Sequence, residues 1–166
     1  MEREKTLSTG VVGGVLRQYL RRLGSPTVTD MLCSGFYIDP RFYPQPQLQR
    51  SGVSDPGYNH LLLGPFCGKP ACQLINTTPG KARGVCADAY LKRETVLVPN
   101  VTAYPGHIAC DGETNSEIVC PLIVREDGDV VVGVLDLDCL ALSGFTEDDK
   151  AGLERIARTI VNACDW

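Results

Sequence analysis

The 166-residue sequence lacks an apolar run long enough to cross a membrane. Its apolar stretches are short, such as Leu61–Leu63 and Val130–Val132, whereas a helical span needs roughly 20 apolar residues. The first residues, Met1–Lys5, carry charges of both signs and no apolar segment follows them, so a secretory signal is not expected. We therefore predict a cytoplasmic protein that has no membrane partner.

Basic residues are scarce in one long segment of the chain. Between Asp111 and Asp149 there are 11 acidic residues and a single basic one, Arg125, so this segment carries a net charge of −10. Binding to nucleic acid needs clustered Lys and Arg that face the phosphates, so a nucleic-acid partner is not expected. An acidic site that faces a small cation fits this charge distribution better.

Histidine occurs only twice, and none of the eight cysteines belongs to a Cys-x-x-Cys pair. Zinc fingers and ribbons are built from such local pairs, so a zinc-binding structural domain is an unsupported alternative, and we expect no metal and no cofactor. The cysteine content also lies below that of a secreted disulfide scaffold. Without a secretory signal, reduced thiols and redox chemistry fit the composition better than structural disulfides.

Hydrophobic periodicity predicts an order of elements that is typical of an α+β domain. Helices are expected over the three ranges 7–23, 84–93 and 146–164. Strands are expected over the six ranges 32–39, 60–63, 71–75, 95–98, 117–124 and 130–138. We therefore expect one central antiparallel β-sheet of about six strands, flanked by helices.

The length of the chain and the absence of internal repeats predict a single domain over residues 1–166. Four prolines and two glycines predict a long exposed loop over residues 40–59. The Gly64-Pro65 pair is expected to end the strand that begins at His60.

An Asp-Gly turn over residues 126–129 joins the last two predicted strands. The register that this turn sets places Glu117 opposite Asp138 and Val119 opposite Asp136, with opposed Cβ atoms about 5 Å apart. The three acidic side chains would then share one face of the hairpin. This face is either a site for an ammonium group, a metal or a proton donor, or a solvated outer face of the sheet.

Two cysteines stand in positions that favour reactivity. Cys86 opens a predicted helix, whose N-terminal dipole would lower the pKa of the thiol. Cys110 lies in a polar loop just before the acidic hairpin, and loop thiols near ionisable groups are the ones that react. Each could instead be an incidental cysteine. The cysteines that fall among apolar positions are expected to fill the core: Cys120, Cys139 and Cys164.

A family resemblance rests on residues 107–119, which read His-Ile-Ala-Cys-Asp-Gly-Glu-Thr-Asn-Ser-Glu-Ile-Val. This run, with Gly35-Phe36-Tyr37 and with residues 133–138, resembles the free methionine-(R)-sulfoxide reductases, which are single GAF-domain enzymes that act on the free amino acid. The similarity covers roughly residues 32–162 and implies a GAF-like fold.

The resemblance implies reduction of free L-methionine (R)-S-oxide to L-methionine by thiol, sulfenic acid and disulfide chemistry. By this resemblance Cys110 is the nucleophile and Cys72 is its resolving partner, while Cys86 is the alternative in either role. A thioredoxin-type dithiol protein would then reduce the disulfide by exchange.

The resemblance also assigns substrate contacts to Glu117, Asp136, Asp138 and Tyr37. Cys33 departs from the family pattern, because it stands where family members usually carry a tryptophan. A homodimer is a further expectation from the family. The main alternative from another class is a non-catalytic GAF module that senses a small molecule or the redox state.

Overall fold

The computed structural model describes residues 31–43, 59–69, 71–108, 110, 112–125 and 129–166. The predicted helix over 7–23 and most of the predicted loop over 40–59 lie outside the described residues. The elements are β1 Met31–Ile38, η2 Pro40–Phe42, β2 His60–Gly68, β3 Leu74–Asn76, α3 Val85–Lys92, β4 Val96–Val98, η3 Val101–Ala103, β5 Ser116–Val124, β6 Val130–Cys139 and α4 Glu147–Ala163. Among the described residues, no helix is long and apolar enough to cross a membrane.

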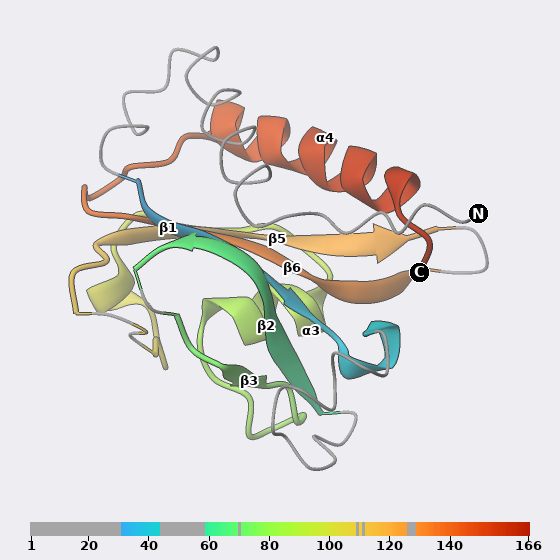
Figure 1. Cartoon of the computed structure of the whole chain (residues 1–166). Helices are drawn as coiled ribbons and strands as arrows, with labels where there is room; N and C mark the ends of the chain where they lie inside the picture. The colour runs from blue at the N-terminus through green and yellow to red at the C-terminus, as the bar shows by residue number, and fades with distance from the viewer. Residues whose placement is uncertain (1–30, 44–58, 70, 109, 111, 126–128) are drawn as a thin grey trace.

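The six strands form one sheet in the order β3-β2-β1-β6-β5-β4, and every neighbouring pair is antiparallel. This arrangement confirms the predicted α+β fold with about six strands. Helix α4 lies across one face of the sheet, whereas α3 lies against the other (Figure 1). That the whole chain makes a single domain stays a prediction.

Side chains alternate between these two faces, so each face builds its own apolar cluster. Leu135, Leu137 and Cys139 of β6 pack with Leu153 of α4 in the first cluster. Tyr37 and other residues of the opposite face pack with α3 in the second cluster. The acidic residues of β6 alternate with the first set, and they therefore point to the α3 face.

The register of the β5–β6 hairpin agrees with the prediction at the three acidic residues. Glu117 pairs with Asp138, and Val119 pairs with Asp136. Next to the turn the register differs by one residue, because Val132 is an extra residue on β6 and forms a bulge. The predicted partners are confirmed. The predicted pairing of Glu126 with Asp129, from which they were counted, is not tested, because Glu126 lies outside the described residues.

Strand β2 is longer than predicted, and the expectation that Gly64-Pro65 ends it is wrong. The strand continues to Gly68, and the register with β1 shifts where Gly64 and Pro65 together lie opposite Phe36. Proline has no N–H to donate to the ladder, and a bulge leaves one residue without a ladder partner. The pair therefore bends this strand without stopping it.

Helix α4 spans Glu147–Ala163, close to the predicted range of 146–164. Thr146 and Asp149 form a capping box in which each side chain accepts a hydrogen bond from the other residue's backbone N–H. The buried side chains of Leu153, Ala157 and Val161 recur at helical spacing and face the sheet. This helix therefore covers the face opposite the acidic side chains.

Two tyrosine–aspartate hydrogen bonds hold α3 against the rest of the protein. Tyr90 of α3 donates to the buried Asp39 at the end of β1, over 2.7 Å. Tyr104, just after η3, donates to Asp88 of α3 over 2.5 Å. These contacts hold in place the helix whose first turn carries Cys86.

Candidate functional site

A disulfide joins Cys72 and Cys110, which lie 38 residues apart in the sequence and have Cα atoms 5.3 Å apart. Cys72 lies between β2 and β3, and Cys110 lies in the segment that leads from η3 to β5. An exposed ion pair between Lys69 and Glu113 links the same two segments. The two cysteines that the family resemblance pairs are therefore in contact.

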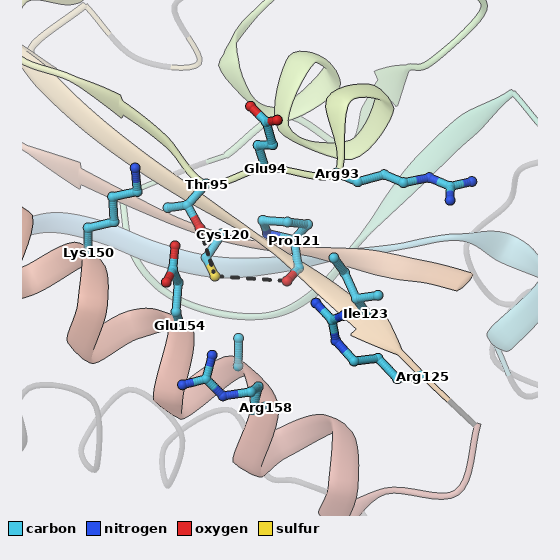
Figure 2. A pocket seen from close by; sticks show the side chains of 11 residues that line it. Arg93, Glu94, Thr95, Cys120, Pro121, Ile123, Arg125, Lys150, Glu154 and Arg158 are labelled. Carbon is cyan, nitrogen blue, oxygen red and sulfur yellow. Dashed lines mark hydrogen bonds between the residues drawn. The ribbon is translucent and has the colours of Figure 1, made fainter. Parts of the chain in front are cut away.

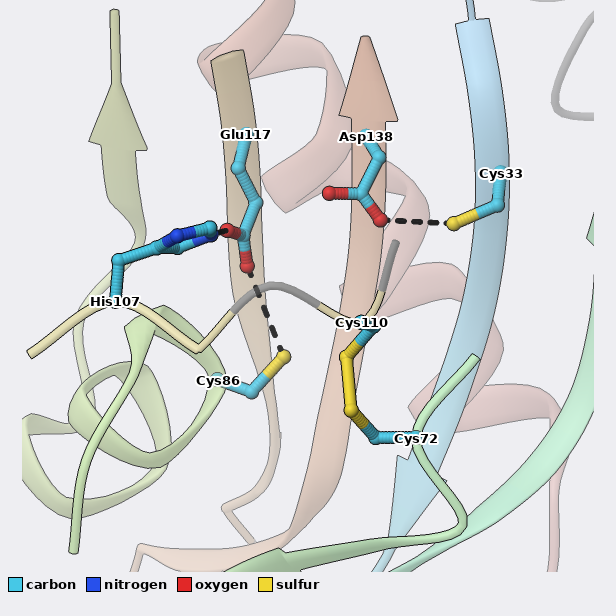
Figure 3. The surroundings of a disulfide bond; sticks show 7 residues. All are labelled: Cys33, Cys72, Cys86, His107, Cys110, Glu117 and Asp138. Atoms are coloured by element: carbon cyan, nitrogen blue, oxygen red, sulfur yellow. Dashed lines mark hydrogen bonds and ion pairs between the residues drawn. A yellow bond between two sulfur atoms is a disulfide. The ribbon is translucent and has the colours of Figure 1, made fainter. Parts of the chain in front are cut away.

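Three carboxyl groups lie close to this disulfide on the α3 face of the sheet. Figure 3 shows two of them, Glu117 and Asp138. Glu117, Asp136 and Asp138 are 6%, 6% and 7% exposed, respectively. A solvated outer face would leave them exposed, so that interpretation is wrong. The three carboxyl groups are buried because α3 and the segment that carries Cys110 cover this part of the sheet.

Burial raises the pKa of Glu117 well above its usual range, and the neighbouring Asp138 adds to this effect. Burial likewise raises the pKa of Asp136, with further contributions from Asp138 and Glu117. Like charges this close cannot all ionise in a site of low dielectric unless a cation joins them. The cluster can therefore hold a proton near neutral pH or bind a cation.

Cys86 lies in the first turn of α3, and its thiol donates to Glu117 Oε1 over 3.9 Å. Burial and the charges of Asp136 and Glu117 raise the pKa of this thiol well above its usual range. The expectation that the helix dipole lowers this pKa is wrong, because desolvation and two acidic neighbours outweigh the dipole of an eight-residue helix. This environment favours the protonated form of the Cys86 thiol.

Tyr37 lies on the same face of β1 and is 1% exposed. Its hydroxyl is buried without a hydrogen-bond partner among the described residues. Burial and the nearby charges of Asp136 and Cys86 raise its pKa, so it stays protonated. Tyr37 is not among the residues that line the cavity described below, and its assigned contact with the substrate stays a prediction.

Sequence reasoning did not assign two further residues that contact the carboxyl groups. His107 Nε2 lies 3.5 Å from Glu117 Oε2, and the Cys33 thiol donates to Asp138 Oδ2 over 2.8 Å (Figure 3). The nearness of His107 to Cys110 in the sequence was a usable signal. No local sequence signal could have indicated the contact of Cys33, because this contact depends on the pairing of β1 with β6.

A small cavity of about 60 Å³ lies among these groups. Its lining includes Cys72, Cys110, Cys86 and the three acidic side chains. A buried water needs about 10–15 Å³, so this space holds roughly four water molecules. In the disulfide-bonded form the free space of the site is therefore small.

A larger cavity, of about 340 Å³, lies on the other side of the molecule between β5 and α4 (Figure 2). Its thiol is Cys120, which accepts a hydrogen bond from Thr95 Oγ1 and whose pKa burial raises to about 11. Cys120 and Cys139 are buried in the core as predicted, whereas Cys164 is only half-buried at the end of α4. The larger cavity thus lacks a reactive thiol.

Comparison with known proteins matches one family model and several curated relatives. The GAF domain family matches residues 44–165. A free methionine-R-sulfoxide reductase of Saccharomyces cerevisiae is 52% identical over 106 residues, which are 64% of this chain and 56% of that protein. The protein of the same name from Escherichia coli is 42% identical over 96 residues, 58% of this chain and 54% of that protein. The matches thus span just over half the length of these relatives.

Solved structures with the same fold cover nearly the whole chain. A structure described as that of the GAF domain has a TM-score of 0.67 and 33% identity, and the match covers 99% of this chain and 94% of that one. A free methionine-R-sulfoxide reductase from Neisseria meningitidis, in complex with its substrate, has a TM-score of 0.64 and 28% identity, with 98% and 93% covered. The chain therefore belongs to the GAF domain family.

Proposed function

We propose that this protein reduces free L-methionine (R)-S-oxide to L-methionine and that the Cys72–Cys110 disulfide is the oxidised product of each turnover. The observation that carries the proposal is the disulfide beside three buried carboxyl groups. The names of the two curated relatives and the substrate complex of a structural relative support it.

Cys110, once reduced, is the nucleophile in this proposal. Its sulfur attacks the sulfoxide sulfur, and a carboxylic acid protonates the sulfoxide oxygen. The oxygen then passes to the cysteine, so that methionine leaves with its sulfur reduced by two electrons and Cys110 becomes a sulfenic acid. The high pKa of Cys86 argues against that thiol as the attacking group.

The proton comes from the carboxyl cluster. Glu117 and Asp136 are the candidates for the donor, because burial raises the pKa of each. The remaining carboxylates, including Asp138, bind the ammonium group of the free amino acid. A residue within a peptide has no such ammonium group, and this difference explains a preference for the free substrate.

Cys72 resolves the sulfenic acid. Its thiol attacks the sulfur of Cys110, a disulfide forms, and the hydroxyl group leaves as water. A thioredoxin-like dithiol protein then reduces the disulfide by exchange. Because the cavity holds only a few water molecules in the disulfide-bonded form, substrate binds after this reduction. A cytoplasmic setting and a homodimer belong to the same proposal.

The test is to incubate the protein with both epimers of free methionine sulfoxide and dithiothreitol, and to follow each epimer by chiral chromatography. We expect loss of the R epimer alone, with an equal gain of methionine. An N-blocked methionine sulfoxide amide, which lacks the ammonium group, should remain. Equal turnover of the blocked compound would contradict the proposal, and binding without turnover would favour a sensing module.

A further inference from the structure

Cys86, Glu117 and Asp136 form a compact set of donor groups from three different elements, α3, β5 and β6. We name this set the Cys86 centre. All three residues are buried, and one ligand atom from each lies within 4.8 Å of the other two. The sequence could not indicate this set, because its members lie far apart along the chain and share no metal-binding spacing.

The distances suit a zinc ion. Zinc lies about 2.3 Å from a thiolate sulfur and about 2.0–2.2 Å from a carboxylate oxygen, and its tetrahedral geometry places two such donors about 3.5 Å apart. Cys86 Sγ and Glu117 Oε1 are 3.9 Å apart. A thiolate with carboxylates selects zinc over magnesium or calcium, which prefer oxygen ligands alone.

A second observation points to a cation independently of the clustering. Asp136 Oδ1 is buried and has no hydrogen-bond partner among the described residues, and Asp136 lines the small cavity. An unsatisfied buried acceptor costs roughly 1–3 kcal/mol, and more when the group is charged. A metal ion that Asp136 binds through this oxygen would satisfy it.

The surroundings offer a further donor and further negative charge. His107 Nε2 lies 3.5 Å from Glu117 Oε2, so its imidazole can either complete the coordination or orient the Glu117 carboxylate. Asp138 lies opposite Glu117 across the β5–β6 ladder. Because Cys86 is not part of the Cys72–Cys110 disulfide, the Cys86 centre keeps its donors in the oxidised protein.

We propose that the Cys86 centre binds one zinc ion and that zinc competes there with the ammonium group of the amino acid substrate. Binding displaces the proton of the Cys86 thiol to solvent and leaves a metal-bound thiolate. The competition rests on the proposed function, whereas the metal site stands on the geometry alone. The proposed sulfoxide reduction uses no zinc, so an ion that displaces the substrate ammonium group would act as an inhibitor.

The test uses the disulfide-bonded protein in a buffer free of thiols, so that Cys72 and Cys110 cannot bind the metal. Cobalt(II) replaces zinc as a probe, because a thiolate ligand gives a charge-transfer absorption that carboxylates alone do not. We expect one cobalt ion per chain, with this absorption, and displacement of cobalt by zinc. Absence of the absorption at saturating cobalt would overturn the proposal.

Variants locate the metal. Cys86→Ser should abolish the charge-transfer absorption, and Asp136→Asn should weaken cobalt binding about tenfold or more while the absorption remains at saturation. Cys67→Ser removes a half-buried thiol at the end of β2 and should change neither property. If Cys86→Ser does not fold, the Asp136→Asn titration decides. Cobalt binding that is unchanged in Asp136→Asn, or absorption lost in Cys67→Ser, would overturn the proposal.

The competition is measured separately on the Cys72→Ser/Cys110→Ser double variant, in which neither of these thiols can bind the metal. This variant cannot form the disulfide or consume substrate in the proposed mechanism. We expect free methionine (R)-sulfoxide to weaken cobalt binding and the N-blocked amide to leave it unchanged. If the free sulfoxide leaves cobalt binding unchanged, the proposed competition is overturned but the metal site is not. Failure of the metal-free protein to reduce the sulfoxide would overturn the proposed function alone.

Discussion

Glu117 and Asp138 face each other across the β5–β6 ladder, and both carboxyl groups are buried. Two carboxylates on cross-strand neighbours repel each other strongly when water is excluded. In the proposed function the pair is relieved by a proton in the free enzyme and by the substrate ammonium in the complex. In this proposal the repulsion within the pair favours binding of a ligand and lowers the stability of the free protein.

Neutralising single members of the cluster should lower catalytic efficiency. The changes are Glu117→Gln, Asp136→Asn and Asp138→Asn, and each removes a charged hydrogen-bonding group worth about 1.5–3 kcal/mol, or roughly ten- to two-hundredfold in kcat/KM. Loss of the proton donor should lower kcat, whereas loss of an ammonium contact should raise KM. Steady-state kinetics on free methionine sulfoxide measure both effects.

Asp165→Asn is the matched control for these three variants, because it makes the same change of charge at an exposed position after α4. We expect kinetics like those of the unmodified protein. If all three cluster variants stay within a few-fold of this control, the buried carboxyl groups play no part in the reaction.

The two disulfide cysteines should have distinguishable roles in a single turnover. Cys110→Ser should release no methionine, because no sulfenic acid can form. Cys72→Ser should release about one methionine per chain and then stall with the thioredoxin system, because resolution fails. Cys67→Ser should behave as the unmodified protein. Retained release in Cys110→Ser together with loss in Cys86→Ser would move the nucleophile to Cys86.

Local patterns predicted the site only in part. Strand alternation placed Asp136 and Asp138 on one face. The register counted from the turn paired Glu117 with Asp138, as observed, although a bulge at Val132 lies between the turn and this pair. Their burial depends on α3 and distant loops, which no local pattern encodes. The same tertiary burial raises the pKa of Cys86 and reverses the prediction made from its place at a helix start.

The contact of Cys72 with Cys110 was equally inaccessible from spacing, and it was expected only because of a family resemblance. The predicted end of strand β2 was wrong for a different reason. The Gly64-Pro65 signal for a turn was real, but the pairing of β2 with β1 on both sides turned it into a bulge within one strand.

The buried carboxyl groups also predict how stability changes with pH. The pKa of Asp136 is raised in the folded protein, so the folded state holds a proton that the unfolded chain releases above about pH 4. The free energy of unfolding should therefore fall as pH rises from about 4 towards the folded-state pKa, by up to about 1.4 kcal/mol per pH unit for such a group.

Asp136→Asn should flatten this decline and make the protein more stable than the unmodified chain at alkaline pH. Urea unfolding at a series of pH values measures the effect, with Asp165→Asn as the control. An equal slope in Asp136→Asn and in the control would show that Asp136 does not hold a proton in the folded state.

Cys33 should act on the reaction through Asp138. Cys33→Ala removes the thiol that donates to Asp138 Oδ2, and a lost hydrogen bond of about 0.5–1.5 kcal/mol predicts a rise in KM of roughly two- to tenfold. Cys33→Ser keeps a donor and should recover most of the loss. If the alanine and serine variants have the same KM, the hydrogen bond does not position Asp138.

One measurement tests the central claim most directly. The reduced protein is mixed with free methionine (R)-sulfoxide without any external reductant, quenched with an alkylating reagent, and analysed for released methionine and for linked peptides. The account predicts about one methionine per chain and a Cys72–Cys110 link that forms at the same rate. Release of methionine without this link, or a link that contains Cys86 instead, would contradict the assigned roles, and no release at all would contradict the proposed reaction.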